Sequence, residues 1–193
     1  KLRIGIDVSS LSPNFFGGSD TYCRGLLSGF AYGFNNCDFQ VYITEDYFKN
    51  RKKQLIFQNN FKYIITKLPL HKKILLKIYN RVLPRVSIFF KKNKYRFDYI
   101  LKNIIFSEFK HLVENNSDVL ISPNVLLKCY NLKIPSILNM HDIQHVHFPH
   151  YFSFEENQRR DMQYFNSAHS TKHMIASGNF IKKDLVKRFP FLK

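Results

Sequence analysis

The chain has 193 residues and a hydrophobic content of 45%, with only seven glycines and seven prolines, which excludes a disordered or fibrous protein and predicts one domain with its own core. Its three cysteines are widely spaced, which excludes a disulfide framework and a cysteine metal motif and indicates a reducing cytoplasm. The net charge is +16, and no apolar run of about 20 residues is present to cross a bilayer, so we expect a location in the cytoplasm or peripherally at the inner face of the membrane.

The spacing of apolar residues predicts strands and helices that alternate along the chain. The expected strands cover 2–10, 38–44, 62–68, 118–124, 133–142 and 172–178. The expected helices cover 19–34, 71–95, 97–115, 153–170 and 179–189. Because parallel strands need crossover connections, which are usually helices, this order predicts a Rossmann-like, doubly wound and mainly parallel α/β sheet in a single domain, residues 1–193.

Capping residues and prolines set the expected helix ends. Ser19 is expected to be the N-cap of the first helix. Ser153 and Glu156 have the spacing of a capping box at the start of the fourth. Pro84 is expected to interrupt the helix 71–95, because proline lacks a backbone N–H and its ring clashes with the preceding turn.

Four groups of small or polar residues follow expected strands. They are Ser9 and Ser10 with the Gly17–Gly18 loop, Ser122 to Asn124, His141 with Asp142, and Ser177 with Gly178. The carboxyl ends of parallel strands lie along one edge of the sheet, where ligands of doubly wound domains bind. We therefore expect these groups to converge on one rim.

Two of these groups have chemistry that suits a ligand. Gly17 and Gly18 precede a helix N-terminus, where free N–H groups and the positive end of the helix dipole favour an anion; a structural turn is the alternative and is favoured when the glycines are taken alone. His141 and Asp142 follow a strand directly. There an imidazole can hydrogen-bond a substrate hydroxyl or polarise a leaving group, and a purely structural His-Asp pair is the alternative.

A zinc site is the other interpretation of the histidines. His141, His145, His147 and His150 have spacings that ligands can have, but the stretch is expected to be a loop and no cysteine lies near it. We therefore expect no metal. Cys23 lies in a helix among Tyr and Leu neighbours, which favours packing in the core over chemistry.

The basic residues are concentrated in one segment. Residues 49–96 hold half of the thirty Lys and Arg residues, and no acidic residue lies between Asp46 and Asp98. An anionic membrane surface, a solvated basic face over a core helix, and nucleic acid could each account for this charge; the apolar residues beside it favour the membrane. The residues expected to face the membrane are Lys72, Lys73, Lys77, Arg81 and Arg85.

Several stretches resemble retaining GT-B glycosyltransferases of the glycosyltransferase 4 type. RIGIDVSSLSPNFFGGSDTYCRGLL is similar to the opening strand of that family and to its G-G-x-E-x-Y-like loop, which leads into a helix. DVLISPN, IPSILNMHDIQHVHFPHYFS and HMIASGNFIKKDLVKRF resemble later segments of the same family, in the same order. Residues 45–97 carry no motif of the family.

The resemblance implies the N-terminal, acceptor-side half of a GT-B fold, with the C-terminal domain that binds the donor absent from this chain. The enzyme would transfer a sugar from a nucleotide-sugar donor to a glycan or lipid-linked acceptor in cell-envelope polysaccharide synthesis, with retention and without a metal or cofactor. Gly17 and Gly18 would approach the donor diphosphate, and His141 and Asp142 would form the catalytic pair. The residues implied to line the cleft are Ser19, Asp20, Asn124, Ser177 and Gly178.

Three positions depart from the family pattern. Asp20 replaces the commoner Glu, Gly178 falls where Ser is frequent, and Ile181 replaces a usual Ser or Thr. The last two weaken the expectation that this final motif binds a ligand. The alternative function is a non-catalytic Rossmann-like module that binds nucleic acid or recruits the protein to a membrane; of these partners we expect the anionic membrane surface and no nucleic acid.

Overall fold

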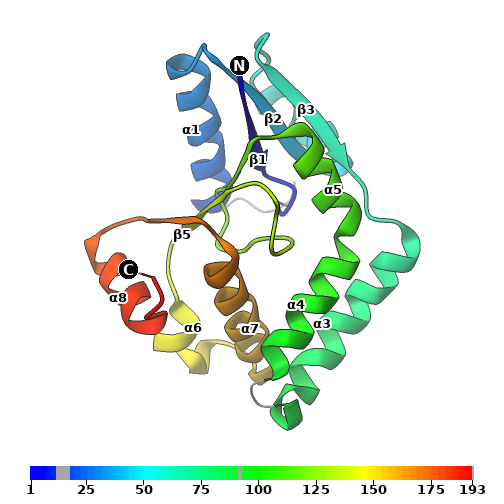
Figure 1. Ribbon diagram of the computed structural model, residues 1–193, viewed down its shortest axis with the longest axis vertical. Coiled ribbons are helices and arrows are strands. Elements are labelled where there is room, and N and C mark those ends of the chain that lie inside the picture. The colour runs from blue at the N-terminus through cyan, green and yellow to red at the C-terminus, as the bar shows by residue number, and fades with distance from the viewer. Residues whose placement is uncertain (12–17, 91–92, 193) are drawn as a thin grey trace.

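The computed structural model describes residues 1–11, 18–90 and 93–192. The strands are β1 (Leu2–Asp7), β2 (Cys37–Thr44), β3 (Phe61–Thr66), β4 (Val119–Ser122), β5 (Ser136–Met140) and β6 (His173–Ala176). They form a six-stranded sheet in the order β3-β2-β1-β4-β5-β6, and every neighbouring pair is parallel (Figure 1). The predicted Rossmann-like α/β fold is therefore confirmed.

Helices connect the strands. They are α1 (Gly18–Gly33), α2 (Glu45–Arg51), α3 (Leu70–Phe90), α4 (Asn93–Ile105), α5 (Ser107–Asn116), α6 (Gln144–His147), α7 (Phe154–Ser170) and α8 (Asn179–Arg188). Short 3-10 helices lie at Lys52–Gln54 and Pro149–Tyr151. The loop expected around the histidines contains the short helix α6, and no prediction covered the position of α2; both helices are too short to show a helical period.

Three helix predictions were wrong in detail. The helix α3 continues through Pro84, which is buried against the core, so packing overrides the local cost of the proline. The expected helix 97–115 is two helices, because Phe106 leaves the helical backbone (φ −105°, ψ 26°) between α4 and α5. Ser19 lies inside the first turn of α1 and does not precede it.

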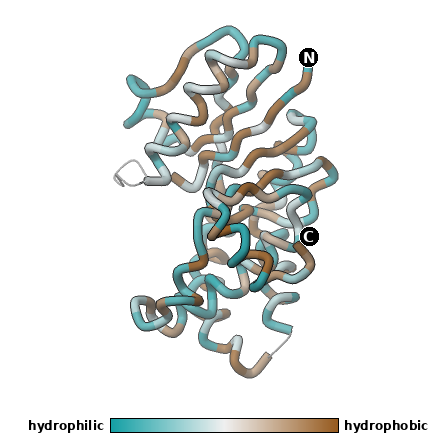
Figure 2. The backbone as a smooth tube through the Cα atoms, turned by 90° about the vertical axis from the view of Figure 1, so that its left-hand side faces the viewer, coloured by the Kyte–Doolittle hydropathy of each residue, from teal (hydrophilic) through white to brown (hydrophobic). Residues whose placement is uncertain are grey.

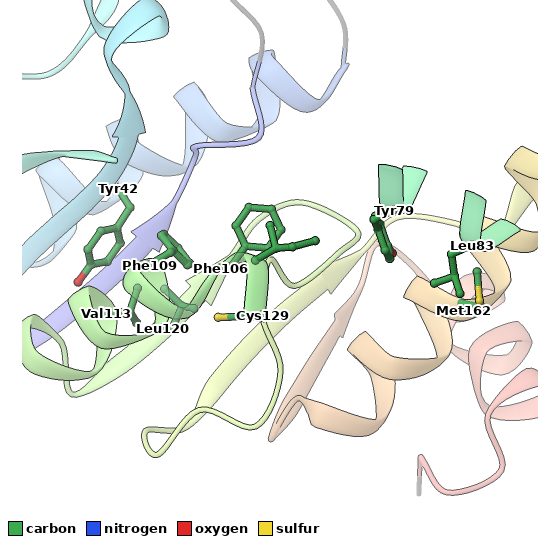
Figure 3. Packing of buried hydrophobic residues seen from close by; sticks show 10 residues of the cluster. Tyr42, Tyr79, Leu83, Phe106, Phe109, Val113, Leu120, Cys129 and Met162 are labelled. Atoms are coloured by element: carbon green, nitrogen blue, oxygen red, sulfur yellow. The ribbon is translucent and has the colours of Figure 1, made fainter. Parts of the chain in front are cut away.

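Side chains from both faces of the sheet form the core. On one face, α1 and α2 cover β1 and β2, and the buried residues there are Ile6, Val8, Cys23, Leu27, Phe39, Val41, Ile43 and Tyr47. On the other face, α3, α5 and α7 enclose a second cluster. Figure 3 shows it extending from Tyr42 and Phe109 at the sheet to Tyr79, Leu83 and Met162, where α3 meets α7. A third cluster packs α7 and α8 against β5.

The distribution of hydrophobic residues along the chain matches this arrangement of strands and helices. Figure 2 shows hydrophobic stretches in the strands, whereas the helices alternate between hydrophobic and hydrophilic residues, as expected when a helix buries one side. Within the described ranges, no helix combines the length and the apolar character needed to span a bilayer.

The sheet is packed closely around Gly5 in the central strand β1. A Cβ atom added to Gly5 would lie 2.6 Å from Ser117 Oγ and 3.0 Å from a ring carbon of Tyr42. Ser117 Oγ is itself 2.7 Å from the Tyr42 hydroxyl, so it is held in place by a buried hydrogen bond. Glycine is therefore needed at position 5 because the side chains of Ser117 and Tyr42 leave no room for a Cβ atom, and not because of its backbone angles.

Candidate functional site

The strand order reverses between β1 and β4, and the candidate site lies at the carboxyl ends of these strands and their neighbours. The chain runs outward from β1 through β2 to β3, then returns to place β4 on the other side of β1. The connections that leave β1 and β4 therefore diverge, which opens a crevice at this edge of the sheet. The four groups predicted from the sequence all follow strands whose ends lie on this edge.

Hydrogen bonds link the loops of this rim one to the next. Asn124, after β4, donates from Nδ2 to the carbonyl oxygen of Asp7 at the end of β1 (3.2 Å). His141 Nε2, after β5, lies 3.2 Å from the carbonyl oxygen of Pro123. Ser177, after β6, donates to the carbonyl oxygen of His141 (3.2 Å). The structure thus brings together Asn124, His141 and Ser177 along adjacent strand ends.

His141 is half-buried, with its ring held from two sides. Besides the contact with Pro123, the ring packs edge-to-face against Tyr22 of α1, with ring centroids 5.0 Å apart. Asp142 accepts from the backbone N–H of Gln144 (3.2 Å) and so starts the turn that leads into α6. The imidazole is therefore oriented by backbone and ring contacts, whereas Asp142 has a local structural partner.

The N-terminus of α1 meets the same rim. Gly17 lies outside the described residues. Gly18 is exposed, and a Cβ atom there would meet nothing within 4 Å; Ser19 is half-buried. Cys23, one turn further on, contacts Asn124, with Sγ 3.9 Å from the amide oxygen.

Asp20, which the resemblance implies to line the cleft, is buried in the structure. Its side chain is buried, and its carboxylate accepts hydrogen bonds from Arg24 (2.9 Å) and from the hydroxyl of Tyr47. The carboxylate therefore ties α1 to α2. The pKa of the Tyr47 hydroxyl is raised, mainly because the hydroxyl is buried and also because it donates to the carboxylate of Asp20.

Gly178 is exposed and caps α8, and a Cβ atom there would meet no neighbour within 4 Å. Its backbone is extended (φ −177°), so the position does not require glycine. Gly178 therefore adjoins the rim only because it follows Ser177, and no contact of Gly178 itself indicates a ligand.

A pocket of 840 Å³ opens beside this rim, at the carboxyl ends of β1, β2 and β3. Its walls are formed by residues after these strands, by α3, by α4 and α5, and by the connection from β4 to β5. The lining side chains that are apolar or aromatic include Leu68, Leu76, Tyr79, Phe106, Phe109, Leu126 and Leu127. This volume is within the range of sites for small molecules, and its mainly apolar lining suits an amphipathic ligand.

Charged side chains of both signs line the pocket: Lys67, Lys73, Lys102 and Lys128 with Asp7, Glu45, Asp46 and Glu108. Lys102 is buried and donates to the carbonyl oxygen of Leu127 (2.7 Å); burial lowers its pKa, and the nearby carboxylate of Asp98 acts in the opposite direction. Lys128 donates to the hydroxyl of Ser9, which in turn donates to Asp7. A deep lysine and a second lysine in the β4–β5 connection could hold an anionic group of a ligand.

Lys102 and Lys128 were not among the site residues expected from the sequence. The only signal for Lys102 is its place four residues after Asp98 on the face of α4 that turns inward, and charged residues on that face would ordinarily be assigned to the surface. Lys128 lies in a connection without regular structure. Neither position could have been distinguished from the many exposed lysines of this chain.

A buried hydrogen-bond network lies under the pocket. Asp98 is fully buried and accepts from the hydroxyl of Tyr79, from the hydroxyl of Tyr130 (3.0 Å) and from Asn166 Nδ2 (2.6 Å). Gln163 also donates to the Tyr79 hydroxyl (2.8 Å). These residues come from α3, α4, α7 and the β4–β5 connection, so the network fixes the floor of the pocket.

The histidines that follow β5 have separate partners. His145 is buried against the ring of Tyr164, with centroids 4.7 Å apart, and burial lowers its pKa to about 4. His147 lies 2.6 Å from a carboxylate oxygen of Asp184 in α8. Among the described residues, no three His, Cys, Asp or Glu side chains gather in a way that could hold a metal ion.

The basic segment divides into buried and exposed residues. Lys72 is buried and pairs with Glu108 of α5, so it does not belong to the predicted membrane-facing set. Lys73, Lys77, Arg81 and Arg85 are exposed on α3, as expected. Arg85 also pairs with Glu155 at the start of α7 (3.2 Å).

No family model matches the chain, and no curated protein matches it significantly. What the structure establishes is a Rossmann-like parallel α/β domain, with a hydrogen-bonded rim and an adjoining pocket at its switch point.

Proposed function

We propose that this chain is the acceptor-side domain of a retaining glycosyltransferase, which transfers a sugar from a nucleotide-sugar donor to a glycan or lipid-linked acceptor in cell-envelope polysaccharide synthesis in the cytoplasm. The observation that carries the proposal is the rim, where Asn124, His141 and Ser177 from three successive strand ends are hydrogen-bonded together beside an 840 Å³ pocket. The resemblance of the same segments to glycosyltransferases of the GT-B type supports it.

In this proposal the donor diphosphate lies against the N-terminus of α1. The first N–H groups of a helix have no partner within the helix, so they and the positive end of the helix dipole attract an anion, and a Cβ atom at Gly18 would meet nothing within 4 Å. His141 hydrogen-bonds the transferred sugar, and its contacts with Tyr22 and Pro123 keep the ring in position. Rate enhancement then comes from positioning and from stabilising the departing diphosphate.

The acceptor occupies the pocket in this proposal. Apolar walls accommodate a lipid or the faces of sugar rings, and Lys102 and Lys128 pair with a phosphate or another anionic group. The pocket and His141 are linked through the short segment from Pro123 to Lys128, so acceptor and donor sugar would meet near the switch point.

The test is transfer of a radiolabelled sugar from UDP- and GDP-sugars into a lipid and glycan extract of the source cells, with the complete gene product as enzyme. His141→Ala should lower the rate at least about tenfold, or about 1.4 kcal/mol of activation free energy. Gly18→Val should cost about 2–4 kcal/mol, the scale of a lost oxyanion donor. His111→Ala, on the exposed face of α5, is the matched control and should leave the rate unchanged.

Two results would contradict the proposal. One is the absence of transfer from every donor tested. The other is a rate that His141→Ala and His111→Ala leave equally unchanged, since the rim would then have no part in the reaction.

A further inference from the structure

The outer surface of α3 carries a row of exposed aliphatic side chains. Ile74, Ile78 and Val82 recur every four residues, and each is about half exposed (52%, 51% and 49%). The row continues with Ile88 and with Phe89, which is 81% exposed. A helix in a globular protein normally turns such a row inward, so the exposed row indicates a surface with a partner.

The next helix adds a second row beside the first. Phe97, Ile100 and Ile104 of α4 are 39%, 41% and 50% exposed and recur at helical spacing. The rings of Phe90 and Phe97 join the two helices, with centroids 4.5 Å apart.

Both rows border the line along which α3 and α4 pack. Leu75 of α3 and Leu101 of α4 pack inward against the same core cluster. Helical periodicity places Ile78 beside Leu75 and next to Ile74, and it places Ile104 beside Leu101. The rows therefore form one apolar surface, here called the hairpin face: Ile74, Ile78, Val82, Ile88 and Phe89 of α3 with Phe97, Ile100 and Ile104 of α4.

Positive charge borders the hairpin face. Lys73, Lys77 and Arg81 are exposed along α3, and no carboxylate in the described part of the chain pairs with them. The helix α3 contains no acidic residue, and the single acid of α4, Asp98, is fully buried. The surface thus combines aliphatic side chains with positive charge that its own helices do not neutralise.

We propose that the hairpin face docks on an anionic phospholipid bilayer, with α3 and α4 lying in the plane of the interface. A lipid surface satisfies both features, because headgroup phosphates pair with the lysines and acyl chains take up the aliphatic residues. A second copy of the chain would bring two positive surfaces together. Single-stranded nucleic acid prefers aromatic stacking platforms, whereas this face is mainly aliphatic.

Docking would also bring the pocket to the lipid surface. Lys73, Leu76, Tyr79 and Asn80 of α3 line the pocket, so one helix forms both the docking surface and a pocket wall. The docking proposal does not depend on sugar transfer, and it is tested without an activity assay.

The first experiment measures binding of the purified protein to vesicles. Vesicles with about 30% phosphatidylglycerol in phosphatidylcholine should bind at least about tenfold more tightly than pure phosphatidylcholine vesicles. Raising NaCl from 0.1 to 0.5 M should remove only part of the binding, because salt screens the charges but not the apolar contacts. Equal binding to both vesicle types, or binding to neither, overturns the proposal.

Charge reversal then locates the surface. The triple variant Lys73→Glu, Lys77→Glu, Arg81→Glu should lose at least about 100-fold in affinity for the anionic vesicles. The matched control reverses three exposed lysines, two in α8, which Figure 1 shows on the opposite side of the molecule from α3, and one directly before β6. These are Lys172, Lys182 and Lys183. Equal losses in the two triple variants would mean that net charge alone drives binding, and the hairpin face would lose its role.

A tryptophan reporter covers the case in which the triple variant fails to fold. The chain contains no tryptophan, so Phe89→Trp gives a single fluorophore on the hairpin face. Its emission should shift to the blue with anionic vesicles and be quenched by brominated lipid. Tyr32→Trp on α1, at a position 83% exposed, is the matched reporter and should not respond. An unshifted Phe89→Trp, or binding of the face to poly(U) RNA without vesicle binding, refutes docking on lipid.

Discussion

Replacing Asp98 by Asn should destabilise the domain strongly, because this carboxylate collects three buried donors. It accepts from Tyr79, Tyr130 and Asn166. The amide of Asn has one acceptor oxygen, so at least one hydroxyl loses its partner, which costs about 1–3 kcal/mol, and each surviving bond loses a charged acceptor, about 1 kcal/mol. We expect a loss of about 3–5 kcal/mol in the free energy of unfolding, a large part of the usual stability of a domain.

Equilibrium unfolding in urea at pH 7, followed by far-ultraviolet circular dichroism, measures this loss. The slope of the free energy of unfolding against urea concentration should stay the same, since the variant changes stability and not the surface exposed on unfolding. Asp38→Asn is the matched control. Its carboxylate is 41% exposed and pairs with Lys1 at 3.8 Å, so its loss should stay below about 1 kcal/mol. The reasoning is refuted if the free energies of unfolding of the two variants differ by less than about 1 kcal/mol.

Three further outcomes follow from other sites. Burial lowers the pKa of His145 to about 4, so between pH 6.5 and 4 the unfolded chain binds a proton at this residue more readily than the folded chain does. The free energy of unfolding should therefore fall by up to about 3 kcal/mol as the pH is lowered through this range. In His145→Gln, urea unfolding at several pH values should show a free energy of unfolding that depends less on pH. Gly5→Ala should lower stability by about 1–3 kcal/mol through overlap with Ser117, whereas Gly25→Ala in α1 should raise it by about 0.5–1 kcal/mol; a loss for both in thermal melts would contradict this contrast. Gly18→Val should melt close to the wild-type temperature, because its side chain enters open space.

The order of strands and helices could be predicted from the sequence because each strand is a short apolar run that ends in polar residues. The same pattern predicted which polar groups follow β4, β5 and β6, and the structure links three of them, Asn124, His141 and Ser177, by hydrogen bonds. Pro84 shows the limit of local rules. Its cost inside a helix is a property of the backbone alone, and burial against the core outweighs it.

Charged residues inside the fold could not be predicted. Asp20 and Lys72 belong to residue types that are usually exposed, and only their distant partners in three dimensions, Tyr47 and Glu108, explain their burial. The pocket was missed for a related reason. Its walls come from segments far apart in the chain, and no local pattern records that Lys102 and Lys128 approach the same space.

The chain of contacts along the rim has a consequence for how these loops can vary. Asn124 holds a carbonyl of the β1 loop, His141 lies against a carbonyl of the β4 loop, and Ser177 holds the carbonyl of His141 itself. Each side chain therefore positions the backbone of a neighbouring loop and not its own. Substitutions at these three positions should show epistasis, since a change in one loop alters the backbone that the next one meets. Sequence change at this edge of the sheet is then expected to spread across loops in concert, while the strands beneath it vary independently.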